Sequence, residues 1–133
     1  MPPPADHPAF RLQVLQQIFD VKQYPCDHDI LDVLDSLRAS LNQAGLFSLT
    51  RTAEEVSIVH QAYEGEGRWK CIKILGPMDF GLTGVMCNFT APLKEAKIPV
   101  FVISTWNTDY VLIPAGDVDK AVAVLTHDGW QFV

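Results

Sequence analysis

Two polar turns carry most of the residues in this 133-residue chain whose types and spacing could do chemistry. The first, Gly76–Gly84, follows an apolar run and precedes a stripe of apolar residues at helical spacing. Glycines let a ligand approach the backbone, and the amides of a helix N-terminus attract anions. The second, Ile103–Tyr110, joins two β-rich runs. Turns held by rigid elements are where small proteins place binding groups, so we expect a ligand site at these turns.

Catalytic patterns are scarce elsewhere. The run Cys26–Asp29 puts possible metal ligands close together, although a polar loop before a helix explains such a run more often. His60 lies on a predicted strand and His127 near a predicted helix C-terminus, and neither has a partner visible in the sequence. No Ser-His-Asp set, carboxylate pair or phosphate-binding loop stands out. We therefore predict a non-enzyme with no cofactor and no metal.

The composition excludes several classes of protein. Apolar residues make up 48% and charged residues 20% of the chain, which is typical of a globular protein. The net charge of −6 argues against a nucleic-acid partner, which would need clustered Lys and Arg. No run approaches the about 18 apolar residues of a membrane span, and the start of the chain lacks the apolar segment of a signal peptide. Cys26, Cys71 and Cys87 form no Cys-x-x-Cys pair and suit reduced thiols, so we expect a cytoplasmic protein.

The first half of the chain begins with a proline-rich stretch, residues 1–9, that we expect to be a flexible tail. Alternating apolar residues over Phe10–Val14 indicate a strand, and a second extended piece containing Phe19 and Val21 follows. Asp27 is a candidate N-cap for an amphipathic helix that ends at Gly45. Four apolar residues define its expected core face: Ile30, Leu34, Leu37 and Leu41.

Two further strands are predicted before the middle of the chain. Leu46–Leu49 indicates one, and Val56–His60 indicates the other. Between them, Thr52–Glu55 fits a capping box and predicts one short turn of helix. Glu64–Gly67 then forms a flexible joint that divides the chain almost in half.

The second half has stronger periodic signals. Apolar residues recur at helical spacing over Leu82–Leu93, where Pro92 is expected to kink the helix, and again over Val118–Leu125. Four β-rich runs are predicted as strands: Trp69–Leu75, Val100–Thr105, Tyr110–Ile113 and Trp130–Val133. The order is therefore β-α-β-β-α-β.

This order predicts an α+β fold. Parallel neighbours need helical crossovers and the central hairpin is antiparallel, so a four-stranded sheet with both helices on one face is expected, which is the ferredoxin-like arrangement. The first half repeats part of it as β-α-β-β. We expect two related lobes, residues 10–63 and residues 68–133, with the first a degenerate version of the second.

Three stretches resemble the small two-lobed ACT-domain proteins. They are Leu46–Val59, Gly76–Gly84 and Ile103–Ile113, in the order the family has them. The family is related to the CASTOR arginine sensors and to the regulatory tails of aspartate kinases. The resemblance covers about residues 46–130, and the helix around residues 28–44 looks longer than the family usually has.

The resemblance implies a regulatory domain that binds a small amino acid at an interface between ACT units. Backbone amides would come from the turn before the first helix of the second half: Leu82, Thr83, Gly84 and Val85. Thr105 and Trp106 would form walls, and Asp109 would face an ammonium or guanidinium group. A facing unit would add the start of a strand: Ile98, Pro99 and Val100. Because the chain has one strong ACT unit, a complete site would need a homodimer.

Two positions depart from the family pattern, and several residues have simpler interpretations. Gly81 stands where serine is common, and Trp106 stands where tyrosine or phenylalanine is usual, which reshapes the pocket. Asp79 is equally suited to capping the helix, and Asp109 to bonding its own backbone in the turn. Trp106 is also a candidate for core packing.

The resemblance, taken with these patterns, implies an amino-acid-binding regulatory or sensor module that binds neither nucleic acid nor membrane, with an unidentified regulated protein as a candidate partner. The alternative, from another class, is an ACT module that binds a partner protein without a ligand. A small enzyme with an unrecognised site is a third possibility, which would require a titratable pair with perturbed pKa values in a cleft.

Overall fold

The computed structural model describes residues 11–62, 67–75 and 84–133. The expected tail, Phe10, most of the joint at 64–67 and the turn at 76–83 lie outside these residues. The chain divides into two compact units. The smaller unit is Gln17–Trp69, and the larger unit is Met1–Gln16 with Lys70–Val133.

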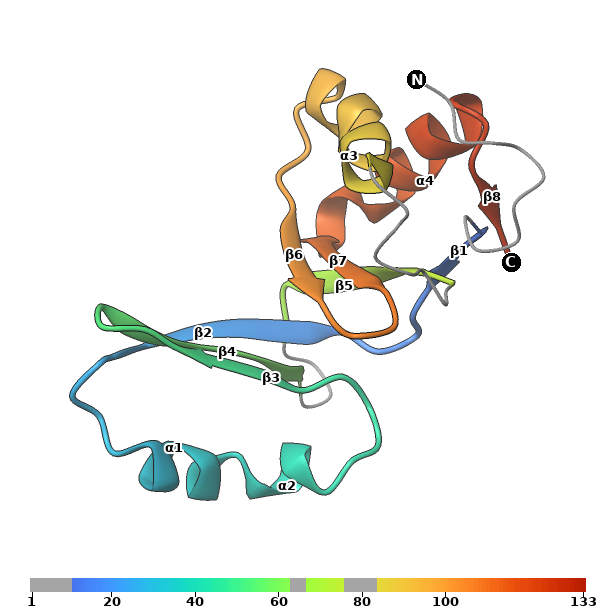
Figure 1. Ribbon diagram of the computed structural model, residues 1–133. Coiled ribbons are helices and arrows are strands. Elements are labelled where there is room, and N and C mark those ends of the chain that lie inside the picture. The colour runs from blue at the N-terminus through green and yellow to red at the C-terminus, as the bar shows by residue number, and fades with distance from the viewer. Residues whose placement is uncertain (1–10, 63–66, 76–83) are drawn as a thin grey trace. The chain divides into compact units, whose positions relative to one another are not determined.

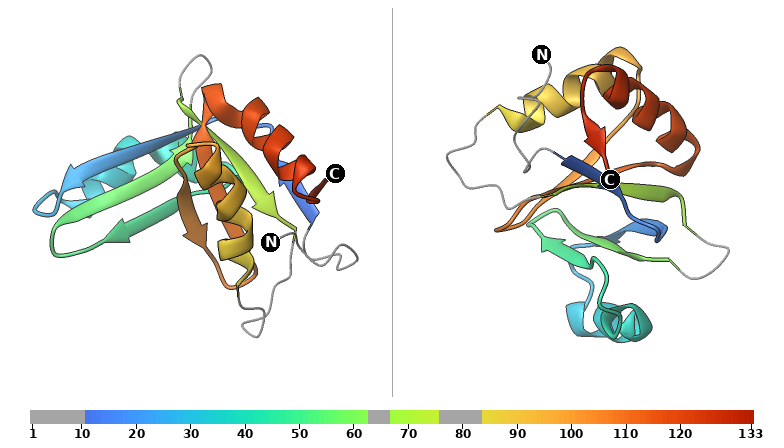
Figure 2. Two further views of the ribbon diagram at one scale, coloured as in Figure 1. Left: turned by 90° about the horizontal axis from the view of Figure 1, so that it is seen from above. Right: turned by 90° about the vertical axis from the view of Figure 1, so that its right-hand side faces the viewer.

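The smaller unit has three strands in the order β3-β4-β2. They are β2 (Phe19–Pro25), β3 (Ser48–Arg51) and β4 (Glu55–Gln61), and both pairings are antiparallel. Helices α1 (Ile30–Ser36) and α2 (Arg38–Leu41) connect β2 to β3 and lie over one face of these strands (Figures 1 and 2). The predicted β-α-β-β order of this half is therefore confirmed.

The predicted helix is broken into two, and its predicted core face was partly wrong. Asp29, not Asp27, is the N-cap of α1, and its carboxylate accepts a hydrogen bond from the backbone N–H of Leu31. At Leu37 the backbone leaves the helical region, so α1 ends there and α2 begins at Arg38. Leu37 is buried as predicted, but its buried companions are Val33 and Ser40. Leu34 is half-buried and Leu41 is exposed.

The expected helical turn between β3 and β4 is also absent. The hydroxyl Oγ1 of Thr52 accepts hydrogen bonds from the backbone N–H groups of Glu54 at 3.1 Å and Glu55 at 3.2 Å, as a helix cap would. The chain then enters β4 at Glu55, whose carbonyl accepts from the N–H of Thr52 at 2.9 Å. The hydrogen bonds of the Thr52 side chain were therefore predicted correctly. Because β3 pairs with β4, however, these bonds close a hairpin turn and do not start a helix.

The larger unit contains the predicted β-α-β-β-α-β order. Its helices are α3 (Val85–Glu95) and α4 (Val118–His127), the latter preceded by a 3₁₀ turn, Ala115–Asp117. Its strands are β1 (Arg11–Val14), β5 (Trp69–Ile74, which begins at the last residue of the smaller unit), β6 (Phe101–Ser104), β7 (Asp109–Pro114) and β8 (Gln131–Phe132). Both helices lie on one face of the sheet (Figures 1 and 2), so the ferredoxin-like fold is confirmed.

Strand β1 adds to this arrangement. It pairs antiparallel with β5 and parallel with β8, which gives the order β8-β1-β5-β7-β6. A four-stranded ferredoxin-like sheet would instead pair β5 with β8. The sequence placed this strand in residues 10–63, whereas both of its partners belong to the larger unit. Local patterns cannot reveal a pairing between segments about 60 residues apart.

The core of the larger unit lies between the sheet and the two helices. Phe89 and Trp130 contact edge to face, with ring centroids 5.5 Å apart. The buried residues come from β1, β5 and β7, from both helices and from the segments that follow the helices: Leu12, Ile72, Ile74, Val85, Phe89, Leu93, Ile98, Val111, Ile113, Ala121, Leu125 and Trp130. This core fixes the start of α3 and the β6–β7 hairpin, where the sequence places the candidate site.

Helix α3 ends in a Schellman motif. The N–H of Lys97 donates to the carbonyl of Lys94, and the N–H of Ile98 donates to that of Leu93, both at 2.9 Å. The residue that turns the chain is Lys97, with a positive φ of 59° where glycine is usual. Helix α4 ends in the same way, with Gly129 at this position. Ile98 is thereby brought into the core beside Leu93.

Candidate functional site

The hairpin turn between β6 and β7 gathers three of the predicted site residues: Thr105, Trp106 and Asp109. In this four-residue loop the N–H of Thr105 donates to the carbonyl of Thr108 at 2.9 Å. The hydroxyl of Thr105 donates to the same carbonyl at 3.1 Å and accepts from the N–H of Thr108 at 3.3 Å. These bonds close the loop, so the residues at its two ends are held in fixed positions.

A side-chain hydrogen bond joins this loop to the neighbouring strand. The hydroxyl Oγ1 of Thr108, which is 4% exposed, donates to the carbonyl of Ile74 at 2.6 Å. The N–H of Leu75 donates to the carbonyl of Arg11 on β1. Because antiparallel ladder bonds alternate in direction, the adjacent carbonyl of Ile74 points away from β1. Thr108 therefore fixes the loop at the point where β5 ends and the chain runs toward α3.

Asp109 is the buried charge of the loop. It is 9% exposed, and its Oδ1 accepts a hydrogen bond of 2.6 Å from the hydroxyl of Ser104, its partner across the hairpin. This bond is to a side chain, in contrast to the backbone bond of an ordinary turn aspartate. A carboxylate has about four acceptor sites, so Asp109 can accept more donors than Ser104 alone.

Trp106 lies at the tip of the loop. Its side chain is 81% exposed, so the core-packing interpretation was wrong. An indole is costly to leave in water and is enriched where proteins meet ligands or partners. Most of the Trp106 side chain is nevertheless open to solvent.

The start of α3 presents backbone groups. Gly84 is the N-cap, with a φ of 77°, and a side chain at this position would meet nothing within 4 Å. No side chain of the described residues caps this end of the helix. Val85 turns its side chain into the core, so it can offer a ligand its amide alone. Leu82, Thr83, Gly81 and Asp79 lie outside the described residues.

The third group of predicted residues lies at the other end of α3. The 11 residues of the helix separate Gly84 from Ile98 by about 16 Å at 1.5 Å per residue. Strand β6 likewise separates Val100 from Thr105. The side chain of Ile98 is in the core, whereas Pro99 and Val100 are exposed. Within one chain these three residues do not reach a small ligand held between Gly84 and Asp109.

Sequence reasoning missed Thr108 and Ser104. Both stand in the polar stretch that was singled out, and the hairpin register could have indicated Ser104, since a four-residue loop puts residues 104 and 109 opposite one another. No local signal indicates the bond from Thr108 to Ile74, because it joins residues that are 34 positions apart.

Two other groups that could do chemistry, Cys71 and His60, are buried. Burial raises the pKa of the Cys71 thiol from 9.0 to about 12, so this thiol stays protonated and unreactive at neutral pH. His60 is buried, with its Nδ1 3.0 Å from the carbonyl of Gln61 and 3.2 Å from the hydroxyl of Ser40. No described group of three His, Cys, Asp or Glu residues is placed to hold a metal ion. Among the described helices, none has the length and apolar character needed to cross a membrane.

Comparison with known families identifies the larger unit. The ACT domain family matches residues 64–127, which include α3, the β6–β7 hairpin and α4. The chain contains an ACT domain. Both turns that the sequence singled out lie inside the matched residues.

Part of this chain is similar to a known arginine sensor. The cytosolic arginine sensor for mTORC1 subunit 1, from Homo sapiens and from Bos taurus, is 33% identical over 58 residues, which cover 43% of this chain. These residues span only 18% of the sensor's length.

Two crystal structures resemble the fold. A protein from Agrobacterium tumefaciens superposes with a TM-score of 0.76 at 26% identity, covering 92% of this chain and 91% of the other. The aspartate kinase of Clostridium acetobutylicum superposes with a TM-score of 0.64 at 12% identity, covering 85% of this chain and 33% of the kinase. The second likeness is one of fold alone.

Proposed function

We propose that this ACT-domain protein binds a small amino acid and acts as a regulatory or sensor module without catalysis of its own. The family match and the likeness to an arginine sensor support a regulatory, amino-acid-binding role. The sensor's name places that relative in the cytosol, and we propose the same compartment for this chain.

The proposal assigns the two ends of the ligand to two elements. The ligand carboxylate lies on the amides at the start of α3, from Leu82 to Val85, where the helix dipole favours an anion. The ligand amine faces Asp109, with Thr105 and Trp106 beside it. One observation carries this assignment: Thr108 bonds the loop to the end of β5, and the chain then leads into α3. The buried carboxylate of Asp109 follows Thr108 directly.

A complete site is proposed to need a second copy of the chain. Ile98, Pro99 and Val100 lie at the far end of α3, and Pro99 and Val100 have exposed side chains. These residues would close a site on a facing ACT unit, and the same residues of the facing unit would close this one. A homodimer would therefore hold two equivalent sites, as the two-fold symmetry of such an interface requires.

Calorimetric titration with each of the twenty amino acids tests the assignment. We expect at least one to bind, and we expect Asp109→Asn to weaken its binding about 10- to 150-fold, since a hydrogen bond to a charged group contributes about 1.5–3 kcal/mol. Asp119→Asn is the matched control, because it removes the same charge from an exposed position on α4. Equal affinity of the Asp109 variant and the control variant would contradict the assignment.

One observation favours a second function, a ligand-free interaction module. Trp106 is 81% exposed at the tip of the loop, and exposed Trp residues dominate many protein interfaces. In this function, Trp106→Ala abolishes binding to a partner protein, and added amino acids leave that binding unchanged. Dependence of partner binding on an amino acid would exclude it.

A further inference from the structure

The helical segment of the smaller unit has apolar residues on two faces. Toward the sheet, Val33 and Leu37 pack against Val56 and Ile58 of β4. On the solvent side a second stripe of three leucines and one arginine follows the 3-4-3 spacing of a helix–helix seam: Leu31, Leu34, Arg38 and Leu41. A surface helix needs only one apolar stripe, so the second stripe is left without a structural role in this unit.

This second stripe lines a hollow on the surface. The hollow has a volume of about 460 Å³, and the stripe shares it with Asp32, Asp35 and Asn42. Leu31 is 74% exposed and Leu41 is 42% exposed, which places both among the most exposed large apolar residues described. Leu34 is half-buried between them. The hollow therefore offers apolar surface that a partner could bury.

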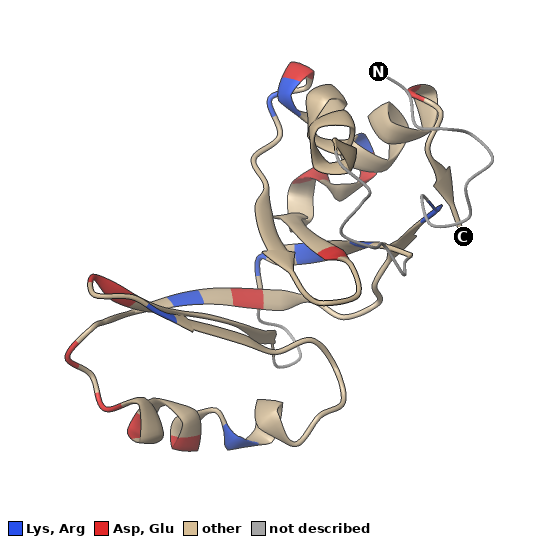
Figure 3. Cartoon of the chain, viewed as in Figure 1, with Lys and Arg blue, Asp and Glu red and all other residues tan. Residues whose placement is uncertain are grey.

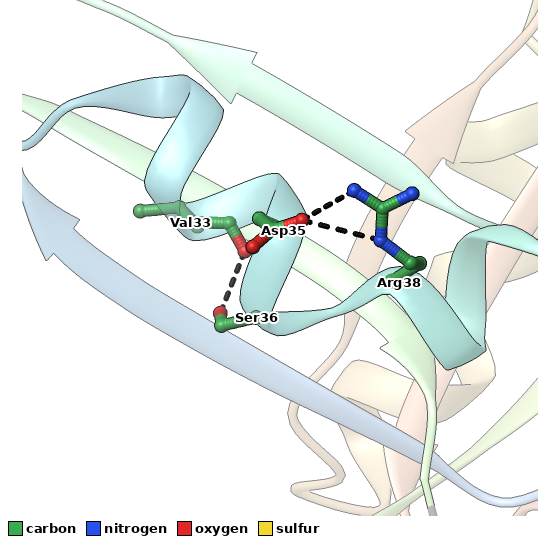
Figure 4. Close-up of polar contacts among 4 residues, drawn as sticks. All are labelled: Val33, Asp35, Ser36 and Arg38. Atoms are coloured by element: carbon green, nitrogen blue, oxygen red, sulfur yellow. Dashed lines mark hydrogen bonds and ion pairs between the residues drawn. The ribbon is translucent and has the colours of Figure 1, made fainter.

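The charge around the hollow is acidic. Residues 27–38 carry four carboxylates and one guanidinium, and Figure 3 shows the acidic residues along α1. The guanidinium of Arg38 donates to the Asp35 carboxylate, through Nε at 3.2 Å and also through Nη2 (Figure 4). Asp29 is engaged as the N-cap. The charges of Asp35 and Arg38 cancel, whereas Asp32, in the first turn of α1, adds a carboxylate. The rim of the hollow therefore has a net negative charge.

We propose that this hollow is a docking site for a basic amphipathic helix of another protein. Apolar residues of the partner, spaced three and four apart, lie against Leu31, Leu34 and Leu41, and its Lys or Arg residues face Asp32 and Asp35. The net negative charge favours a basic occupant over an anionic membrane surface, which it would repel.

The probe for this proposal is a synthetic helix of about five turns, 18 residues, with Leu on one face and Lys on the other. Its twin carries Glu in place of Lys. Each is titrated into the isotope-labelled full chain while amide NMR shifts are followed. We expect the Lys helix to shift amides within residues 30–42, with an affinity that falls as salt is added, and the Glu twin to leave them unchanged.

Variants separate this docking site from general attraction to an acidic protein. Leu31→Ser should weaken binding of the Lys helix about tenfold, because it removes an apolar side chain that the complex would bury. Val133→Ser is the matched control, because Val133 is 67% exposed and lies outside the hollow. Asp32→Asn should weaken binding and reduce its salt dependence. Asp109→Asn should leave the affinity for the Lys helix unchanged, although it should weaken amino-acid binding. Failure of the amino-acid site and failure of this docking site are therefore distinguishable.

Four outcomes would overturn the proposal. Shifts spread over acidic residues of both units, or a Leu31→Ser variant that binds as the wild type does, would make the attraction non-specific. Equal binding of the Glu twin would remove the role of charge. Concentration-dependent dimers in sedimentation that Leu31→Ser abolishes would assign the hollow to a second copy of the chain.

Discussion

Replacing Thr108 by Val should destabilise the protein and loosen the candidate site. Valine keeps the shape of threonine but has no hydroxyl, so the bond from Oγ1 to the carbonyl of Ile74 is lost. That carbonyl belongs to a fully buried residue and points away from its β1 neighbour. A buried acceptor left without its donor costs about 1–3 kcal/mol. The free energy of unfolding should fall by this amount.

Urea unfolding followed by circular dichroism measures this change, with two comparisons. Thr108→Ser keeps the hydroxyl and removes a methyl group, so it should lose less than Thr108→Val. Thr50→Val makes the same replacement at an exposed position of β3 and should stay within about 0.5 kcal/mol of the wild type. A Thr108→Val variant as stable as the wild type, or more stable than Thr108→Ser, would refute the structural role given to this bond.

Three other predictions concern the helix ends and the thiols. Lys97→Gly should raise the free energy of unfolding by about 1 kcal/mol, because Lys97 has a φ of 59° that favours glycine. Gly129→Ala should lower the free energy of unfolding, because Gly129 also has a positive φ. Calorimetric melting measures both changes. Alkylation followed by mass spectrometry should label the exposed Cys26 and Cys87 in the folded protein and Cys71 only after unfolding. Folding raises the pKa of the Cys71 thiol from 9.0 to about 12, so as the pH rises this thiol loses its proton first in the unfolded chain. The free energy of unfolding should therefore fall between pH 9 and pH 12, by at most about 1.4 kcal/mol per pH unit. Cys71→Ala should flatten that decline in alkaline unfolding curves.

Much of the fold was readable from the sequence because its elements have clear periods. The apolar stripe over Leu82–Leu93 became α3, and the two β-rich runs around Thr105–Thr108 became the β6–β7 hairpin. The family resemblance was confirmed by the ACT domain match. These elements depend on neighbours close in the chain, which is where sequence patterns are informative.

The errors arise where distant segments decide the local structure. Thr52 makes the bonds of a helix cap, yet pairing between β3 and β4 turns the chain back as a hairpin. The face of the helical segment that packs on the strands carries Val33, Leu37 and Ser40, so Leu34 and Leu41 lie off the expected core face. Strand β1 found its partners in the larger unit, and nothing in Arg11–Val14 specifies them.

The candidate site was predicted in part. The sequence drew attention to the loop that holds Thr105, Trp106 and Asp109, and the structure shows what keeps that loop in place, Thr108 and Ser104. The ligand roles of these residues stay predictions. They depend on a second molecule and on residues 76–83, so neither the sequence pattern nor the described residues decide them.

Amide NMR of the isotope-labelled chain, titrated with each of the twenty amino acids, tests the central claim most directly. The account predicts that at least one amino acid shifts the amides of Val85–Cys87 together with those of Thr105–Asp109, and that Asp109→Asn removes both sets of shifts. Twenty titrations that leave these amides unmoved, or a ligand that shifts amides only elsewhere, would contradict it.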